Sequence, residues 1–263
     1  MSCAIAFLLA IETILGQQPK TSGDVQRFGW PRTDLEITVD STRVQPSLAL
    51  GSWAAFSNGM VMGDLVLKPA ELDGTLRALE AGGIEVTAVH NHLSNDLAYV
   101  HFSGQGDPDK LATALKSALA KTSTPQGGGQ APPPVQSDAF NRFQETLGRK
   151  GTVNGKVLQF SVPRAERISE HGMTIPPAMG VATAINVQEA PAGVATSGDF
   201  VLIADEVNPV IRELQAKGIR VTALHSHMLR ETPRLFFMHF WGAGNAATIA
   251  EGIRNALAKT NVK

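Results

Sequence analysis

The stretch Gly83-Ile84-Glu85-Val86-Thr87-Ala88-Val89-His90-Asn91-His92 returns later in the chain as Gly218-Ile219-Arg220-Val221-Thr222-Ala223-Leu224-His225-Ser226-His227. In both copies a glycine precedes a run rich in apolar and β-branched residues, and the run ends in His-x-His. Such a run is typical of a strand, and a glycine in front of it is typical of the end of a helix. The repeated stretch therefore predicts two copies of one helix–strand unit.

The correspondence continues in both directions along the chain. Gly63-Asp64-Leu65-Val66-Leu67 corresponds to Gly198-Asp199-Phe200-Val201-Leu202, and Ala118-Leu119-Ala120-Lys121-Thr122 to Ala256-Leu257-Ala258-Lys259-Thr260. Between the copies lies a Gly- and Pro-rich segment without apolar periodicity, which is typical of a linker. The sequence thus predicts an internal duplication, with a first repeat over residues 1–122, a linker over 123–137 and a second repeat over 138–263.

Each copy alternates helical and extended patterns in the same order. Extended segments are expected at Leu35–Val39 and Val157–Val162. Apolar residues three to four positions apart predict amphipathic helices around Leu72, Leu76 and Leu79 and around Val207, Ile211 and Leu214. Mixed order of this kind predicts an α+β fold of two tandem homologous domains, each a mostly antiparallel sheet with helices packed on one face.

Composition excludes several classes of protein. Among the 263 residues, 23 Lys and Arg balance 24 Asp and Glu, so no general charge attracts nucleic acid or anionic lipid. The single cysteine, Cys3, excludes an intrachain disulfide framework and a cysteine-rich zinc module. The partner expected is a small molecule or a metal ion and not a nucleic acid, and the composition leaves the oligomeric state open.

The N-terminal apolar run has two interpretations. One is an amphipathic helix over Ile5–Leu15 that ends at Gly16, and the other is the tail of an export signal. The run is too short to span a bilayer, so no integral membrane segment is expected.

Six of the seven histidines occupy corresponding positions: His90, His92 and His101 in the first copy, and His225, His227 and His239 in the second. Residues two apart on a strand share a face, so each His-x-His points two rings the same way. We expect a hairpin that sets His101 opposite His90 and Tyr99 opposite His92. In the second copy it sets His239 opposite His225 and Phe237 opposite His227. Three imidazoles then converge on one patch in each copy.

Three imidazoles with an open fourth position suit a divalent metal, and Zn²⁺ or Cu²⁺ is the ion expected. The alternative is that the histidines are structural and that the duplication copied them. No carboxylate is expected beside the triad in both copies to orient the rings.

The seventh histidine lies in Ile168-Ser169-Glu170-His171-Gly172, ahead of a stretch rich in Pro, Gly and Met. Glu170 and His171 are candidate catalytic residues, as general acid or base or as a fourth ligand, and a solvated turn is the alternative. Val39 is expected to stand at the His171 position in the first copy. The segment Arg230–Arg234 is expected to be a solvated turn or, alternatively, an anion clamp.

The second-copy segments Thr174–Asn186, Gly198–Leu202 and Val221–Met228, with Pro233–Trp241, resemble the LppY/LpqO family of exported bacterial proteins and lipoproteins. The resemblance covers nearly the whole chain and implies a tandem architecture and a periplasmic or secreted setting. It supplies no activity. The first copy lacks the Pro-Arg-x-Phe hairpin, so its site is expected to be degenerate.

Several functions remain open at this point. The chain is a metal-binding module, a metal-assisted hydrolase that uses Glu170 and His171, or a structural or interaction protein. A metal-free phosphoesterase with two His-x-Ser/Thr motifs is disfavoured, because Trp241 stands where the second motif needs a hydroxyl. Since Glu170 and His171 have no clear counterparts in the first copy, we expect the second copy to carry the more important site.

Overall fold

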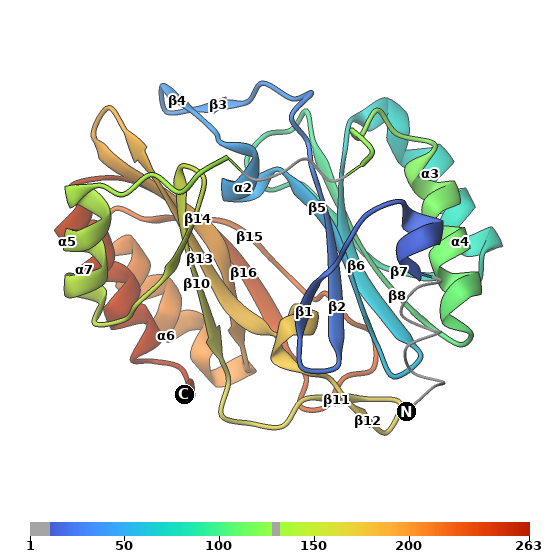
Figure 1. Ribbon diagram of the computed structural model, residues 1–263. Coiled ribbons are helices and arrows are strands. Elements are labelled where there is room, and N and C mark those ends of the chain that lie inside the picture. The colour runs from blue at the N-terminus through green and yellow to red at the C-terminus, as the bar shows by residue number, and fades with distance from the viewer. Residues whose placement is uncertain (1–10, 128–131) are drawn as a thin grey trace. The chain divides into compact units, whose positions relative to one another are not determined.

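The computed structural model describes residues 11–127 and 132–263, and its strands form two six-stranded sheets, one in each half (Figure 1). The strand order is β1-β2-β5-β6-β8-β7 in the first sheet and β9-β10-β13-β14-β16-β15 in the second. Neighbouring strands in both sheets pair in the antiparallel sense. These observations confirm the predicted α+β class with two tandem domains.

The elements of the first half have the following bounds: β1 Lys20–Ser22, β2 Val25–Pro31, β3 Thr38–Val39, β4 Thr42–Arg43, α2 Pro46–Ala49, β5 Gly51–Ser57, β6 Met60–Leu67, α3 Pro69–Ala81, β7 Glu85–His90, β8 Ala98–Gln105 and α4 Pro108–Leu119. The strands β3 and β4 form a separate two-stranded ribbon. The predicted extended segment Leu35–Val39 is a strand only at its last two residues.

The second half repeats this order: α5 Asp138–Leu147, β9 Thr152–Asn154, β10 Val157–Pro163, β11 Ser169–Glu170, β12 Met173–Thr174, η1 Pro177–Met179, β13 Ala182–Ala190, β14 Gly193–Leu202, α6 Ala204–Gln215, β15 Arg220–His225, β16 Phe236–Gly244 and α7 Ala246–Leu257. The strands β11 and β12 form the counterpart of the β3–β4 ribbon.

Two of the predicted segments are only partly described. Of the predicted helix Ile5–Leu15, the residues before Ile11 lie outside the described part, and Ile11–Leu15 is helical. Of the predicted linker 123–137, residues 128–131 lie outside it as well. Among the helices of the described ranges, none has both the length and the apolar character needed to cross a bilayer.

Alternate residues of each strand face the helices and form the core. The first half contributes the buried cluster of Phe28, Leu65, Leu79, Phe102 and Leu115, and the second half that of Phe160, Phe200, Leu214, Phe240 and Ile253. Strand periodicity places the residues between these positions on the opposite face of each sheet. His101 and His239 lie on these opposite faces, because each is flanked in its strand by core residues.

The structure divides into two compact units, which match the two repeats except for two segments. Each of these segments, called the exchanged segments below, belongs to one repeat in the sequence but to the unit of the other repeat in the structure. Unit 1 contains most of the first repeat together with Ala178–Gly180, and unit 2 contains most of the second repeat together with Glu36–Leu50. Each unit therefore includes residues contributed by the other repeat.

Corresponding side chains fix the two exchanged segments. In unit 1 a guanidinium nitrogen of Arg27 donates to the carbonyl oxygen of Ala178 at 3.1 Å. In unit 2 the amide of Gln159 donates to the carbonyl oxygen of Ser47 at 3.0 Å. Arg27 and Gln159 correspond in the duplication, since each precedes the matched Phe28 or Phe160. The exchange is thus itself part of the repeated architecture.

A buried arginine joins the sheet to the helices in each unit. Arg164 donates to both carboxylate oxygens of Glu206, at 2.6 and 2.9 Å, and to the carbonyl oxygen of Val201. The same carboxylate accepts from the backbone N–H groups of Ile203 and Asn261. Glu206 therefore holds a strand end, the start of α6 and the C-terminal segment together.

We expect Glu206→Ala to destabilise the protein by about 3–5 kcal/mol, because it leaves the buried Arg164 without its main counter-charge. Glu166→Ala is the matched control. Glu166 also binds Arg164, but its side chain is 26% exposed, and its loss should cost less than about 1 kcal/mol. Urea unfolding followed by circular dichroism measures both values, and equal losses in the two variants would contradict this interpretation.

Candidate functional site

The histidine hairpins have a different register from the predicted one. His90 lies opposite Tyr99 and Ala88 opposite His101, and in the second copy His225 lies opposite Phe237 and Ala223 opposite His239. The predicted pairing of His90 with His101 and of His225 with His239 is therefore wrong by two residues in both copies. Because an even shift keeps every side chain on its face, the third histidine remains a diagonal neighbour of the first.

The loops that connect the paired strands are longer than predicted, and this explains the shift in register. In the first copy the amide of Asn91 donates to the carbonyl oxygen of Leu97 at 2.8 Å, and in the second the hydroxyl of Ser226 donates to that of Leu235 at 3.1 Å. These side-chain bonds close the loops just beyond the last paired residues, where the expected tighter hairpins would have continued the ladder. The bulges at Val86/Ala88 and Val221/Ala223 lie beyond the histidine pairs, away from the turn, and change the register only from there on.

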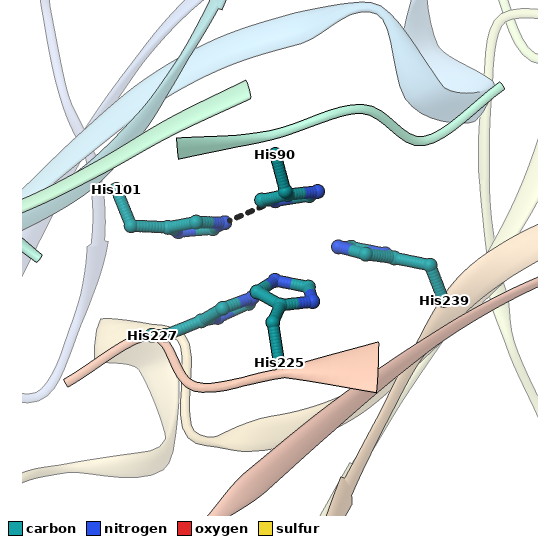
Figure 2. A group of neighbouring side chains, drawn as sticks. All are labelled: His90, His101, His225, His227 and His239. Carbon is teal, nitrogen blue, oxygen red and sulfur yellow. Dashed lines mark hydrogen bonds between the residues drawn. The ribbon is translucent and has the colours of Figure 1, made fainter. Parts of the chain in front are cut away.

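In unit 2 the three histidines of the second copy come together (Figure 2). The ring centroids are 4.7 Å apart for His225 and His227, 5.0 Å for His225 and His239, and 5.8 Å for His227 and His239. One nitrogen from each ring lies within 4.8 Å of a nitrogen of each of the others. His227 and His239 are buried, and His225 is half-buried.

His227 lies two residues beyond the end of β15, so the strand does not orient its ring. The ring instead stacks on Phe237, with centroids 3.7 Å apart and planes 15° apart. In the first copy Tyr99 stands at the Phe237 position, and His92 lies tilted against it at 5.2 Å and 59°. The second ring of the His-x-His…His set is therefore stacked on its neighbour in the second copy and tilted against it in the first.

A carboxylate that the sequence analysis missed lies beside the second-copy triad. The Asp199 carboxylate is 3.5 Å from Nε2 of His227 and 3.8 Å from Nδ1 of His239. Its counterpart Asp64 is 4.0 Å from Nε2 of His101. The expectation that no carboxylate would accompany the histidines in both copies is therefore wrong. Asp64 and Asp199 pair directly with His101 and His239 across neighbouring strands, and the repeated Gly-Asp in the sequence was the available signal.

Glycine immediately before each aspartate is required by the packing of the strands. A Cβ at position 198 would lie 2.0 Å from the carbonyl oxygen of Ala184, and one at 63 would lie 2.3 Å from the ring of Phe102. The carbonyl oxygen of Gly198 also accepts a hydrogen bond from Nδ1 of His239 at 3.2 Å. With its proton on Nδ1, a neutral His239 presents the Nε2 lone pair as the ligand atom.

In unit 1 two of the three first-copy histidines come together. Nε2 of His90 lies 3.1 Å from Nε2 of His101, as the dashed line in Figure 2 marks. Nδ1 of His90 donates to the carbonyl oxygen of Asn91 at 2.9 Å. Burial lowers the pKa of His90, with the Asn91 carbonyl acting in the opposite direction. His92 is not among the grouped ring nitrogens of the described residues.

Asp64 has a different electrostatic environment from an ordinary surface carboxylate. Burial raises its pKa to about 8, opposed by the charge of Arg27 and by the backbone of Val100. Burial also lowers the pKa of Arg27 to about 10, opposed by Asp64, so the guanidinium stays charged at neutral pH. Arg27 lies over the ring of Trp53, 3.6 Å from its centroid.

The predicted catalytic pair lies in the β11–β12 ribbon. Glu170 is buried, and its carboxylate accepts from the backbone N–H of Arg230 at 3.2 Å. His171 is exposed at the turn of the ribbon, with φ of 49°. Neither belongs to the histidine groups of the described residues. The counterpart of His171 is Asp40, with φ of 46° in the matching ribbon turn, and not Val39 as expected.

The Arg230–Arg234 segment is organised around a buried carboxylate. Glu231 accepts from Arg234 at 3.2 Å and from the backbone N–H of Leu235 at 2.8 Å. Arg234 also donates to the carbonyl oxygen of Met228 at 3.1 Å. Arg230, Thr232 and Arg234 are exposed, as expected for a solvated turn, whereas Glu231 is buried and pairs with Arg234 within the segment.

A comparison with known protein families identifies the family of this chain. A family model described as Domain of Unknown Function (DUF1259) matches residues 9–121 and 141–259, one match to each repeat. The chain belongs to the DUF1259 family. The match supports the duplicated domain predicted from the sequence, while the narrower LppY/LpqO resemblance stays a prediction. No curated protein shows a significant match to this DUF1259 chain.

Among solved structures, the DUF1259 chain shows weak likeness to several microcompartment shell proteins and to the protein EtuB. The fused permuted hexameric shell protein MSM0275 from the RMM microcompartment is 11% identical, with 76% of this chain and 83% of that chain covered and a TM-score of 0.24. EtuB from Clostridium kluyveri is 10% identical, with 91% and 90% covered and a TM-score of 0.21. TM-scores this low support no conclusion about shared structure or function.

The raised pKa of Asp64 predicts a measurable dependence of stability on pH. Between the ordinary carboxyl value of 3.8 and the folded value of about 8, the folded state binds the extra proton. Stability therefore falls as the pH rises through this window, by at most about 1.4 kcal/mol per pH unit. Asp64→Asn removes this loss, so its stability relative to wild type should increase steadily from about pH 5 to about pH 8. Urea unfolding at intermediate pH values measures the difference, and a difference independent of pH would contradict the assignment.

Proposed function

We propose that this DUF1259 protein binds a divalent metal ion in unit 2 through His225, His227 and His239. The observation that carries the proposal is the convergence of three ring nitrogens within 4.8 Å of one another. Zn²⁺ or Cu²⁺ suits such a set, because imidazole is a borderline ligand and three protein ligands leave a position for water or for a small molecule.

The surroundings of the triad support this proposal. Metal-bound histidines commonly donate their second ring N–H to a carboxylate or to a backbone carbonyl. Here Nδ1 of His239 donates to Gly198, and the Asp199 carboxylate lies near both His227 and His239. The carboxylate also supplies a negative charge close to the bound cation. This arrangement favours binding of a dication over a purely structural cluster of neutral rings.

A hydrolytic activity and a cellular location rest on other grounds. Metal-assisted hydrolysis with Glu170 and His171 stays a prediction, because the carboxylate of Glu170 is held by a loop backbone and His171 lies at an exposed turn. We propose a periplasmic or secreted location on the LppY/LpqO resemblance alone.

The direct test measures metal content in protein purified without a histidine tag. We expect elemental analysis to find a divalent metal, and Zn²⁺ titration of the stripped protein to show a saturable site. His227→Ala should weaken Zn²⁺ binding by more than about 100-fold, because it removes a ligand and not an outer partner.

His92→Ala is the matched control for His227→Ala. It deletes the corresponding imidazole from the first copy, where that ring is outside the grouped nitrogens, and it should retain Zn²⁺ affinity. Equal losses in the two variants would indicate a symmetric module. Full metal binding by both folded variants would show that the histidines are structural.

A second prediction concerns the orienting carboxylate. Asp199→Asn should weaken Zn²⁺ binding by about 10–100-fold, the range observed when a partner of a ligating histidine is lost. Asp64→Asn, the same change at the matched position of unit 1, should leave the affinity of the triad unchanged. Calorimetric titration of both variants gives the comparison, and an unchanged affinity in Asp199→Asn would exclude this role.

A further inference from the structure

The two sheets carry corresponding rows of residues, each with an aspartate and a histidine, on the face opposite the core. In unit 1, Trp53 of β5 pairs with Asp64 of β6, which pairs with His101 of β8. In unit 2, Ala184 of β13 pairs with Asp199 of β14, which pairs with His239 of β16. Aspartate and histidine thus occupy the same two places in both rows.

The two rows differ in charge at one position of the sheet. Arg27 of β2 lies diagonally from Trp53, since it pairs with Ala55, and its guanidinium covers the Trp53 ring at 3.6 Å. Gln159 of β10 has the same diagonal relation to Ala184, since it pairs with Asn186. The row of unit 1 therefore includes a positive charge that the row of unit 2 lacks.

Unit 1 nevertheless has ligand groups at a suitable spacing. Two nitrogens bound to one tetrahedral Zn²⁺ at 2.0–2.1 Å lie about 3.3 Å apart. The Nε2 atoms of His90 and His101 are 3.1 Å apart, and the Asp64 carboxylate lies 4.0 Å from the second of them. Oδ1 of Asp64 is buried and makes no hydrogen bond in the described part of the structure.

We propose that His90, His101 and Asp64 form a latent metal site in unit 1, and that the guanidinium of Arg27 suppresses binding of a divalent cation there. This inference rests on the proposed metal site of unit 2. The guanidinium of Arg27 covers the ring of Trp53, and Trp53 pairs with Asp64 in the neighbouring strand, so a fixed positive charge lies in the same row as the proposed ligands. This charge repels a dication.

The chain itself suggests a conservative way to remove the charge. Gln159 holds the position corresponding to Arg27 and donates from its side chain to the backbone of an exchanged segment, as Arg27 does. Glutamine at position 27 is therefore expected to keep the hydrogen bond to Ala178 while removing the charge. Arg27→Lys, which keeps the charge, is the matched control.

The test is the number of Zn²⁺ ions bound per chain, measured by calorimetric titration and by elemental analysis after gel filtration. Wild type and Arg27→Lys should bind one ion, and Arg27→Gln should bind two. The second ion should bind at least about tenfold more tightly in Arg27→Gln than any second ion in wild type. Arg27→Gln/His90→Ala should return to one.

A double variant locates the added ion. His227→Ala alone should bind no Zn²⁺ tightly, whereas Arg27→Gln/His227→Ala should bind one. A wild type that binds none would overturn the proposed function itself. If wild type and Arg27→Gln each bind one Zn²⁺ ion, only the latent site is overturned. The latent site is also overturned if wild type binds two Zn²⁺ ions. Circular dichroism checks folding, and Arg27→Met, which keeps an aliphatic side chain over Trp53, replaces Arg27→Gln if that variant does not fold.

Discussion

The buried guanidinium–carboxylate pair is the interaction on which each unit depends. Arg32 in unit 1 and Arg164 in unit 2 are fully or almost fully buried, and each donates to a glutamate at the start of a helix, Glu71 or Glu206. Burial works against the ionised form of Glu71, but hydrogen bonds from Arg32 and from backbone groups outweigh it, so its pKa lies below the usual range. Such pairs are strongly destabilising to break, because the remaining charge stays buried.

This pair also sets the position of the polar row. Arg164 binds the carbonyl oxygen of Val201, in the same strand as Asp199, and Arg32 binds that of Val66, in the same strand as Asp64. The glutamate in turn accepts from the backbone at the helix start and after the last helix, at Ser123 or Asn261. The strand that carries each aspartate is thus anchored at its end to two of the helices that cover the core.

The duplication and the fold class could be predicted from the sequence, because apolar periodicity and repeated glycines are local signals. The convergence of His225, His227 and His239 could also be anticipated, since an error of two residues in register leaves side chains on the same face. Asp64 and Asp199 were missed because they are far in sequence from the histidines and meet them only through strand pairing. The exchanged segments 36–50 and 178–180 were not foreseeable either, since their contacts depend on which sheet each segment reaches.

Divergence between the repeats is compensated within each unit. Gly82 lies against Ala114, where an added Cβ would come within 2.2 Å of the Ala114 Cβ, and the corresponding pair in unit 2 is Lys217 and Gly252. The glycine is on the first segment in unit 1 and on the second in unit 2, so one partner always lacks a side chain where the two helical segments meet closely.

The two sets of histidines also differ together with a neighbouring residue. Phe237 stacks on His227, whereas His92 lies tilted against Tyr99, which carries an additional hydroxyl group. A single change on the partner strand thus accompanies the difference between a triad in one copy and a pair in the other, although all six histidines persist in the sequence.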